Sequence, residues 1–166
     1  MMDALLLAVL LAGEAPLSAD PTLFPNYTRI RADVAAAGQP SREALEGLAT
    51  RGFRTVVNLR RDDENGIKDE RAIVEAQGLR YVHVPVSAAS LSRGDVETIA
   101  RVLEDPASGP VLLHCAAATR VGAVWALVEA ARGVPLEEAI AEGKRAGLRG
   151  DTMIEAVRRV AAEPSR

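Results

Sequence analysis

Residues 111–120, VLLHCAAATR, decide the fold that this sequence predicts. The first four are mostly apolar and follow a Gly-Pro turn, a pattern typical of a strand buried on both faces of a sheet. After Arg120, apolar residues recur at helical spacing, which indicates a helix. Ligands of open α/β sheets bind beyond the carboxyl ends of the strands. Cys115, at the end of the predicted strand, is therefore expected to lie where such a fold carries its site.

The rest of the chain alternates between strand and helix patterns. Further strands are expected at 55–60 (TVVNLR) and 81–86 (YVHVPV), with one or two short edge strands within 27–37. Helices are expected at about 41–51, 68–77, 92–103, 120–132, 136–146 and 151–162. We predict a three-layer α/β fold, in which helices cover both faces of a mainly parallel sheet of four to five strands.

Size and composition limit the possible functions. The chain has 166 residues, 48% hydrophobic and 26% charged, and we expect one domain spanning 20–166. The net charge of -3 gives no basic surplus for binding nucleic acid or an anionic membrane. One cysteine cannot form an internal disulfide, and with two histidines it does not suggest a structural zinc site. No metal or other cofactor is expected.

The N-terminal segment differs from the rest in composition. Residues 4–12 (ALLLAVLLA) are an apolar run too short to span a bilayer, so stable membrane insertion is not expected. The run predicts a signal peptide over 1–19, with small-residue cleavage sites after Ala15 or Ala19, and hence a periplasmic or secreted protein. The absence of Lys or Arg before Arg29 favours the alternative, a helix packed on a cytoplasmic protein.

The loop between strand and helix predicts an anion site. Backbone N–H groups at a helix N-terminus point into one concavity, and small side chains let a phosphate approach them closely. The residues expected to bind phosphate are Ala116, Ala117, Ala118, Thr119 and Arg120. The same dipoles stabilise a thiolate, which would make Cys115 a nucleophile, and the planar guanidinium of Arg120 suits two phosphoryl oxygens. The alternative for Cys115 is a buried core thiol.

Three motifs in order carry a family resemblance: AGQPSREALEGLATRGFRTVVNLRRDDENG, GLRYVHVPV and GPVLLHCAAATRVGAVWAL. The sequence resembles the bacterial beta-lactamase hydrolase-like phosphatase family, a branch of the dual-specificity cysteine phosphatases, from about Tyr27 to Leu148. The resemblance implies a phosphatase-like fold and hydrolysis of phosphate monoesters. It also implies Cys115 as the nucleophile that forms a cysteinyl-phosphate, Arg120 as a phosphate ligand, no metal, and a phosphorylated protein or small molecule as partner.

The sequence departs from typical dual-specificity phosphatases within the loop. Four residues separate Cys115 from Arg120, where those enzymes have five, and rhodanese-like sulfurtransferases share the shorter spacing. Family members usually have Gly where this chain has Ala118, so a positive φ is expected there at a cost of about 1 kcal/mol or more. Val121 replaces the hydroxyl that often assists the leaving thiolate. A sulfurtransferase with a persulfide on Cys115, and a catalytically weak oxyanion-binding module, are therefore alternatives.

The proton donor is the least defined part of the expected site. Related phosphatases often place an aspartate after the strand that corresponds to YVHVPV, but residues 87–90 here are Ser, Ala, Ala and Ser. The loop Asp62-Asp63-Glu64 also leaves the sheet at a carboxyl end, and we take Asp63 as the candidate acid, with a solvated turn as the alternative. Arg60 is either a second anion contact or a surface residue. His114 is expected to be structural.

Overall fold

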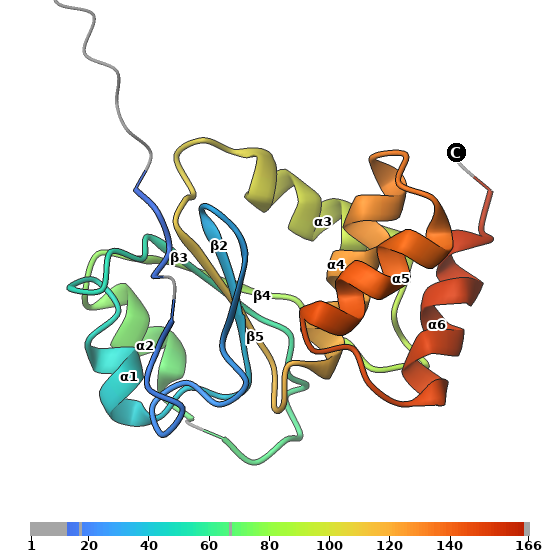
Figure 1. Ribbon diagram of the computed structural model, residues 1–166. Helices are drawn as coiled ribbons and strands as arrows, with labels where there is room; N and C mark the ends of the chain where they lie inside the picture. Colours follow the sequence, from blue (N-terminus) through green and yellow to red (C-terminus); the bar gives the residue numbers. More distant parts are fainter. Residues whose placement is uncertain (1–12, 17, 67, 165–166) are drawn as a thin grey trace, which may run out of the picture.

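The computed structural model describes residues 13–16, 18–66 and 68–164 (Figure 1). Most of the predicted signal peptide, residues 1–12 and 17, lies outside this part of the chain, so both the signal and the domain boundary at residue 20 stay predictions.

Five short strands form one sheet with the order β1-β2-β5-β3-β4. The strands are β1 Thr28–Arg31, β2 Val34–Ala37, β3 Thr55–Asn58, β4 Arg80–His83 and β5 Val111–His114. β1 is antiparallel to β2, and the other neighbouring pairs are parallel. β5 lies in the centre, as its apolar sequence predicts. The expectation of edge strands in 27–37 is correct for β1 but wrong for β2, because β2 pairs with β1 on one side and with β5 on the other.

Six helices accompany the sheet in the described part of the chain. They are α1 Arg42–Glu46, α2 Glu70–Glu75, α3 Arg93–Glu104, α4 Thr119–Ala131, α5 Leu136–Arg145 and α6 Asp151–Ala161. The last four lie close to their predicted ranges, and a capping box of Ser92 and Asp95 begins α3. The first two are shorter than predicted. Gly47 ends α1 early, since glycine is a poor helix former, and the chain continues as turns.

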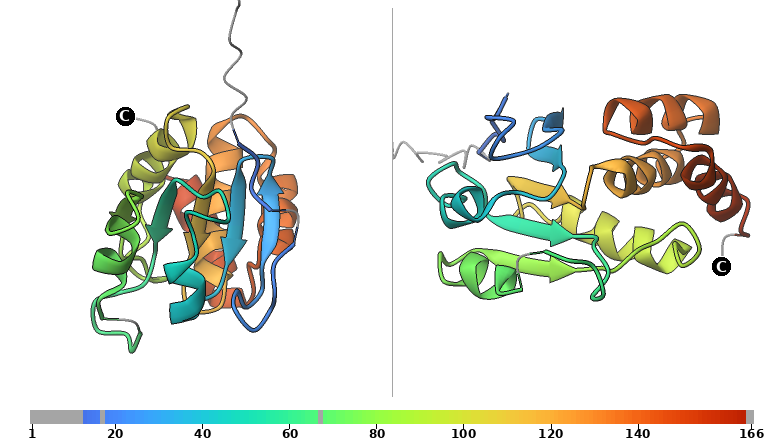
Figure 2. Two further views of the ribbon diagram at one scale, coloured as in Figure 1. Left: turned by 90° about the vertical axis from the view of Figure 1, so that its left-hand side faces the viewer. Right: turned by 90° about the horizontal axis from the view of Figure 1, so that it is seen from below.

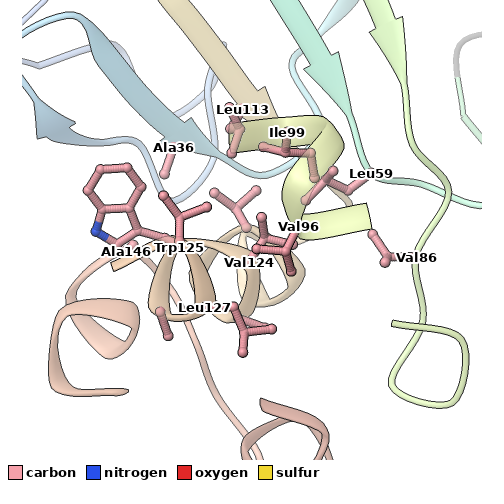
Figure 3. Packing of buried hydrophobic residues seen from close by; sticks show 14 of the residues in the cluster. Ala36, Leu59, Val86, Val96, Ile99, Leu113, Val124, Trp125, Leu127 and Ala146 are labelled. Carbon is pink, nitrogen blue, oxygen red and sulfur yellow. The ribbon is translucent and has the colours of Figure 1, made fainter. Parts of the chain in front are cut away.

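The helices lie on both faces of the sheet, which confirms the three-layer α/β fold (Figures 1 and 2). Side chains of a strand alternate between its two faces. In β5, Leu113 and the following Cys115 pack in the cluster formed with α3, α4, α5 and α6, while Leu112 packs in the cluster formed with α1 and α2. Val124 and Trp125 of α4 are among the residues that fill the larger cluster (Figure 3).

The start of α4 is fixed by close packing against the chain around α5. A β-carbon at Gly122 would lie 2.4 Å from the carbonyl oxygen of Gly143 and 2.2 Å from the backbone nitrogen of Leu148. Only glycine allows backbones to approach this closely. The first turn of α4, which follows the loop after Cys115, is therefore held by backbone contact. None of the helices in the described ranges is long and apolar enough to cross a membrane.

Candidate active site

The loop from Cys115 to Arg120 joins the central strand to α4 at the carboxyl edge of the sheet. Cys115 is 1% exposed, and its backbone N–H donates to Ala37 O at 3.3 Å. Gln39 N donates to Ala116 O at 3.0 Å, so the turn after β2 holds the start of the loop. Burial of Cys115 is compatible with a core thiol and also with a nucleophile at the bottom of an anion-binding loop. The groups around Cys115 must distinguish these two interpretations.

Ala118 has the left-handed backbone conformation that the family comparison predicts. Its φ is 66°, and it directly precedes α4. This conformation costs a non-glycine residue about 1–2 kcal/mol. The methyl group of Ala118 is fully buried and lies against Gly147. A β-carbon added at Gly147 would lie only 2.7 Å from the β-carbon of Ala118. Alanine is thus accommodated by a glycine on the neighbouring segment.

The loop and the first turn of α4 present backbone donors. Gly122 N makes the first bond of the helix, to Ala118 O at 2.9 Å, and no side chain caps the N-terminus. The N–H groups of Thr119, Arg120 and Val121 therefore lack acceptors within the helix, which is the arrangement that binds anions. Ala116 and Ala117 are exposed, so the cradle can be reached from solvent.

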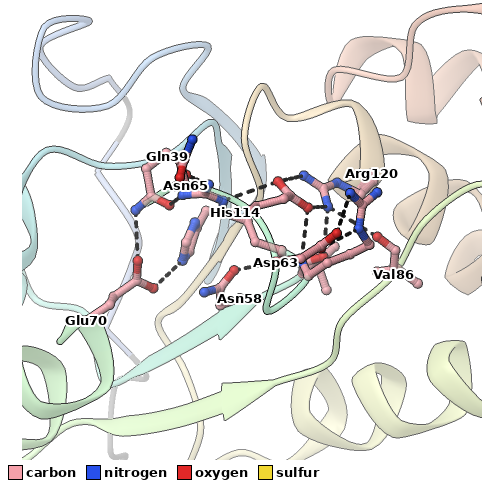
Figure 4. Close-up of polar contacts among 12 residues, drawn as sticks. Gln39, Asn58, Asp63, Asn65, Glu70, Val86, His114 and Arg120 are labelled. Carbon is pink, nitrogen blue, oxygen red and sulfur yellow. Dashed lines mark hydrogen bonds and ion pairs between the residues drawn. The ribbon is translucent and has the colours of Figure 1, made fainter. Parts of the chain in front are cut away.

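Arg120 makes a two-point ion pair with Glu64 (Figure 4). Its Nη1 donates to Glu64 Oε1, and its Nη2 donates to Glu64 Oε2 at 2.8 Å. Nη1 also donates to Leu59 O at 3.3 Å and to Val86 O at 3.2 Å. Both side chains are largely buried, with 13% and 16% exposed. Glu64 is a site residue that sequence reasoning placed in the acidic loop without assigning it this role.

The contacts of Arg120 leave one edge of its guanidinium for a ligand. The side chain of arginine has five N–H bonds. The two on Nη1 donate to Glu64 and to the carbonyl oxygens of Leu59 and Val86, and one of the two on Nη2 donates to Glu64. The Nε–H and the second Nη2 hydrogen form a second fork on the other edge. The pKa of Arg120 is raised, mainly by its hydrogen bond to Glu64. Burial opposes this rise, and the charge of Cys115 contributes to it. The hydrogen bond to Glu64 and the charge of Cys115 both favour the charged form of Arg120.

Glu64 is ionised in this arrangement. The hydrogen bond from Arg120 lowers its pKa from 4.5 to about 2, although burial opposes the shift. Arg61 N and Arg60 Nε also donate to it, at 2.9 Å and 3.4 Å. Glu64 is the one carboxylate that lines the cavity of about 410 Å³ above the loop, beside Ser87, Thr119 and Arg120. A group with such a low pKa does not donate a proton at neutral pH.

We expect the ion pair between Glu64 and Arg120 to make the stability of the fold depend on pH in the acid range. Because the pKa is lowered in the folded state, the stabilisation is fully present above pH 4.5 and is lost as the pH falls through about 2. In urea unfolding experiments from pH 5 to 2, the free energy of unfolding should fall more steeply with decreasing pH in wild type than in Glu64→Gln. Asp62→Asn serves as a control, since the Asp62 side chain is 88% exposed. Equal slopes for wild type and Glu64→Gln would contradict this account.

Asp63 lies in the predicted loop but faces solvent. Its side chain is 72% exposed and accepts from Arg61 Nε at 2.8 Å, which lowers its pKa. It lines a second cavity, of about 540 Å³, together with Asn58, Tyr81 and His83. The structure thus brings Cys115, Arg120 and the loop backbone together and leaves Asp63 outside this group, so its role as proton donor stays a prediction.

The expectation of Arg60 as a surface residue is wrong, because it is only 8% exposed. Its Nη1 donates to Gln39 Oε1 and its Nη2 to Asn65 O, while its backbone N donates to Asn58 Oδ1 at 2.8 Å. His114 is fully buried and bonded to Glu70, as expected for a structural residue. Within the described ranges, no group of three His, Cys, Asp or Glu side chains is arranged to hold a metal ion.

Comparisons with known proteins identify a family that matches most of the chain. Residues 26–132 match the family described as beta-lactamase hydrolase-like protein, phosphatase-like domain. The beta-lactamase hydrolase-like protein of Xylella fastidiosa is 35% identical over 104 residues, which cover 60% of this chain and 24% of that protein. The chain thus matches about a quarter of the length of this relative.

Solved structures show the same fold. Tk-PTP in its active form is 25% identical, with a TM-score of 0.66 over 82% of this chain and 97% of its own. TpbA of P. aeruginosa, solved in complex with pTyr, is 21% identical, with a TM-score of 0.66 over 90% and 89%. The fold is an α/β phosphatase-like fold, and the family match supports a phosphatase. Because the family model covers most of the chain, including the loop from Cys115 to Arg120, this protein belongs to the beta-lactamase hydrolase-like phosphatase family.

Proposed function

We propose that this protein hydrolyses phosphate monoesters through a phosphorylated Cys115. The observation that carries the proposal is the arrangement of the loop, with helix N–H groups that no side chain caps, Ala118 at positive φ, and an arginine held by Glu64 at the end of the loop. The family match supports the reaction class. A core cysteine requires none of these features.

In the proposed reaction, Cys115 Sγ attacks phosphorus, an S–P bond forms, and the P–O bond to the leaving group breaks. The loop N–H groups and the free edge of Arg120 stabilise the charge on the equatorial oxygens. The leaving oxygen takes up a proton, and Asp63, beside Glu64 in the acidic loop, is our candidate donor. Water then attacks phosphorus and gives a proton back to Asp63, the S–P bond breaks, and inorganic phosphate and the thiolate are released.

A sulfurtransferase is the main competing function, because the four-residue spacing between Cys115 and Arg120 is shared with rhodanese-like proteins. In that case Cys115 would carry a persulfide and transfer its outer sulfur from thiosulfate to cyanide. Two assays on one preparation distinguish these possibilities: phosphate release from an aryl phosphate with and without vanadate, and thiocyanate formation. We expect vanadate-sensitive phosphate release. Thiocyanate formation without phosphate release would refute the phosphatase, and absence of both would leave an oxyanion-binding module.

The substrate and the location of the protein are also proposals. TpbA is solved with pTyr, which supports a phosphorylated protein or small molecule as the substrate class here. If residues 1–19 are a cleaved signal, the enzyme acts in the periplasm or outside the cell. Mass spectrometry of protein from its native host would then show a truncated N-terminus, whereas an intact Met1 in a cytosolic fraction would refute export.

A further inference from the structure

We propose that Gln39 and Glu70 are positioning residues, which act through buried and partly buried hydrogen bonds on both ends of the catalytic loop. This inference rests on the proposed function, because it concerns the loop that would bind phosphate. Neither residue touches the reacting atoms, and no local sequence pattern identifies either one. Together with His114, Arg60 and Glu64 they form what we call the Gln39–Glu70 network (Figure 4).

Glu70 is a buried carboxylate, 3% exposed, on a short helix remote from the loop in sequence. Its Oε1 bonds to His114 Nε2 at 2.7 Å and accepts from the Tyr81 hydroxyl at 3.1 Å, and its Oε2 accepts from Gln39 Nε2 at 2.8 Å. Burial acts to raise its pKa, but the bonds from His114, Gln39 and Tyr81 outweigh this and the pKa is lowered. A buried charge must be compensated by such partners, so these contacts fix its neighbours in place.

The contact with His114 reaches the residue next to the nucleophile. The Glu70 carboxylate accepts, so His114 Nε2 carries a proton and the orientation of the ring is set. Because His114 and Leu112 project on the face covered by α2, the bond ties the end of the central strand to that helix. The backbone position of Cys115 follows from this attachment.

Gln39 connects the same carboxylate to the loop. Its backbone N–H holds Ala116 O, and its side chain donates to Glu70 and accepts from Arg60 Nη1. One residue thus contacts the start of the loop through its main chain and two charged groups through its amide. A glutamine can do this because its amide both donates and accepts.

Arg60 continues the network to the other end of the loop. Its Nε lies 3.4 Å from Glu64 Oε2, and Glu64 holds the Nη1 end of Arg120. The side chains of Arg60 and Glu64 are only 9% and 16% exposed, so water screens these charges weakly. A change at Gln39 therefore acts on Arg60, then on Glu64, and finally on the orientation of Arg120.

The test measures binding of inorganic phosphate by calorimetry, because this readout needs no turnover. Gln39→Met keeps the side-chain length and the backbone N–H but removes the amide contacts with Glu70 and Arg60. Glu70→Gln keeps the shape but places an amide group against donors. We expect both variants to bind phosphate about tenfold more weakly than wild type, since a hydrogen bond to a charged group is lost or disturbed. In a Glu64→Gln background, the effect of Gln39→Met should be smaller than in wild type, because the connection to Arg120 is already broken and only the one through Glu70 to His114 remains.

Glu75→Gln is the matched control, on the same helix but in an exposed pair with Arg71, and it should bind phosphate as wild type does. Circular dichroism establishes that each variant is folded. If Glu70→Gln does not fold, the partly exposed Gln39 provides the deciding variant. Folded variants with wild-type phosphate affinity, or a full effect of Gln39→Met in the Glu64→Gln background, would overturn the inference. If wild type itself binds no phosphate, the proposed function fails first.

Discussion

Cys115→Ser is expected to reduce aryl phosphate hydrolysis by roughly 10³-fold or more. A serine hydroxyl is not ionised in the cradle at neutral pH, so the helix N–H groups and Arg120 have no anionic nucleophile to stabilise. The substitution replaces one buried atom of similar size, and the fold should persist. Steady-state kinetics between pH 5 and 7.5, together with a melting curve, measure both effects.

Because Cys115 is the only cysteine of the chain, chemical modification provides an independent check. Iodoacetamide should inactivate wild type with one label per molecule, and phosphate should protect against it. Cys115→Ser should still bind vanadate or phosphate reversibly, since the loop donors and Arg120 are intact. Hydrolysis by Cys115→Ser at the wild-type rate would show that another group attacks phosphorus, and the proposed mechanism would be wrong.

The features that sequence predicts well are those set by local patterns. The apolar run Val111–His114 identifies the central strand, because only a strand covered on both faces requires such a sequence. The positive φ of Ala118 is expected from the glycine that family members usually have at this position. The placement of Cys115 at a carboxyl edge follows from the order of strand and helix.

The features that sequence misses depend on contacts between distant segments. Ser41 correctly predicts the start of α1, but 27–37 gives no sign that β2 pairs on both sides, since pairing is decided by the return of β5. Glu64 and Arg120 are separated by 56 positions, and Glu70 and His114 by 44. Charged residues in a loop or on a short helix usually face solvent, so their burial becomes evident only when the sheet brings its carboxyl ends together.

Arg120→Lys is expected to reduce kcat/KM by about 10²- to 10³-fold, although the positive charge is kept. A lysine ammonium cannot bind two phosphoryl oxygens through a planar fork while also contacting Glu64 and the carbonyls of Leu59 and Val86. We expect a loss of phosphate affinity together with a fall in kcat, because the fork binds the ester and stabilises the transition state. Arg145→Lys, in an exposed pair with Glu142, is the control for a general effect of the substitution.

The charge retained by lysine makes this variant more informative than alanine. In Arg120→Ala, Glu64 loses its main partner, which destabilises the fold. A loss of activity could then not be separated from a loss of stability. With Arg120→Lys, an ion pair with Glu64 can persist, and the dependence of unfolding on acid pH should stay close to that of wild type. A large loss of activity with little loss of stability then isolates the geometry of the guanidinium as the cause. Wild-type activity in Arg120→Lys would mean that Arg120 contributes only its charge, and that the loop N–H groups alone orient the phosphate.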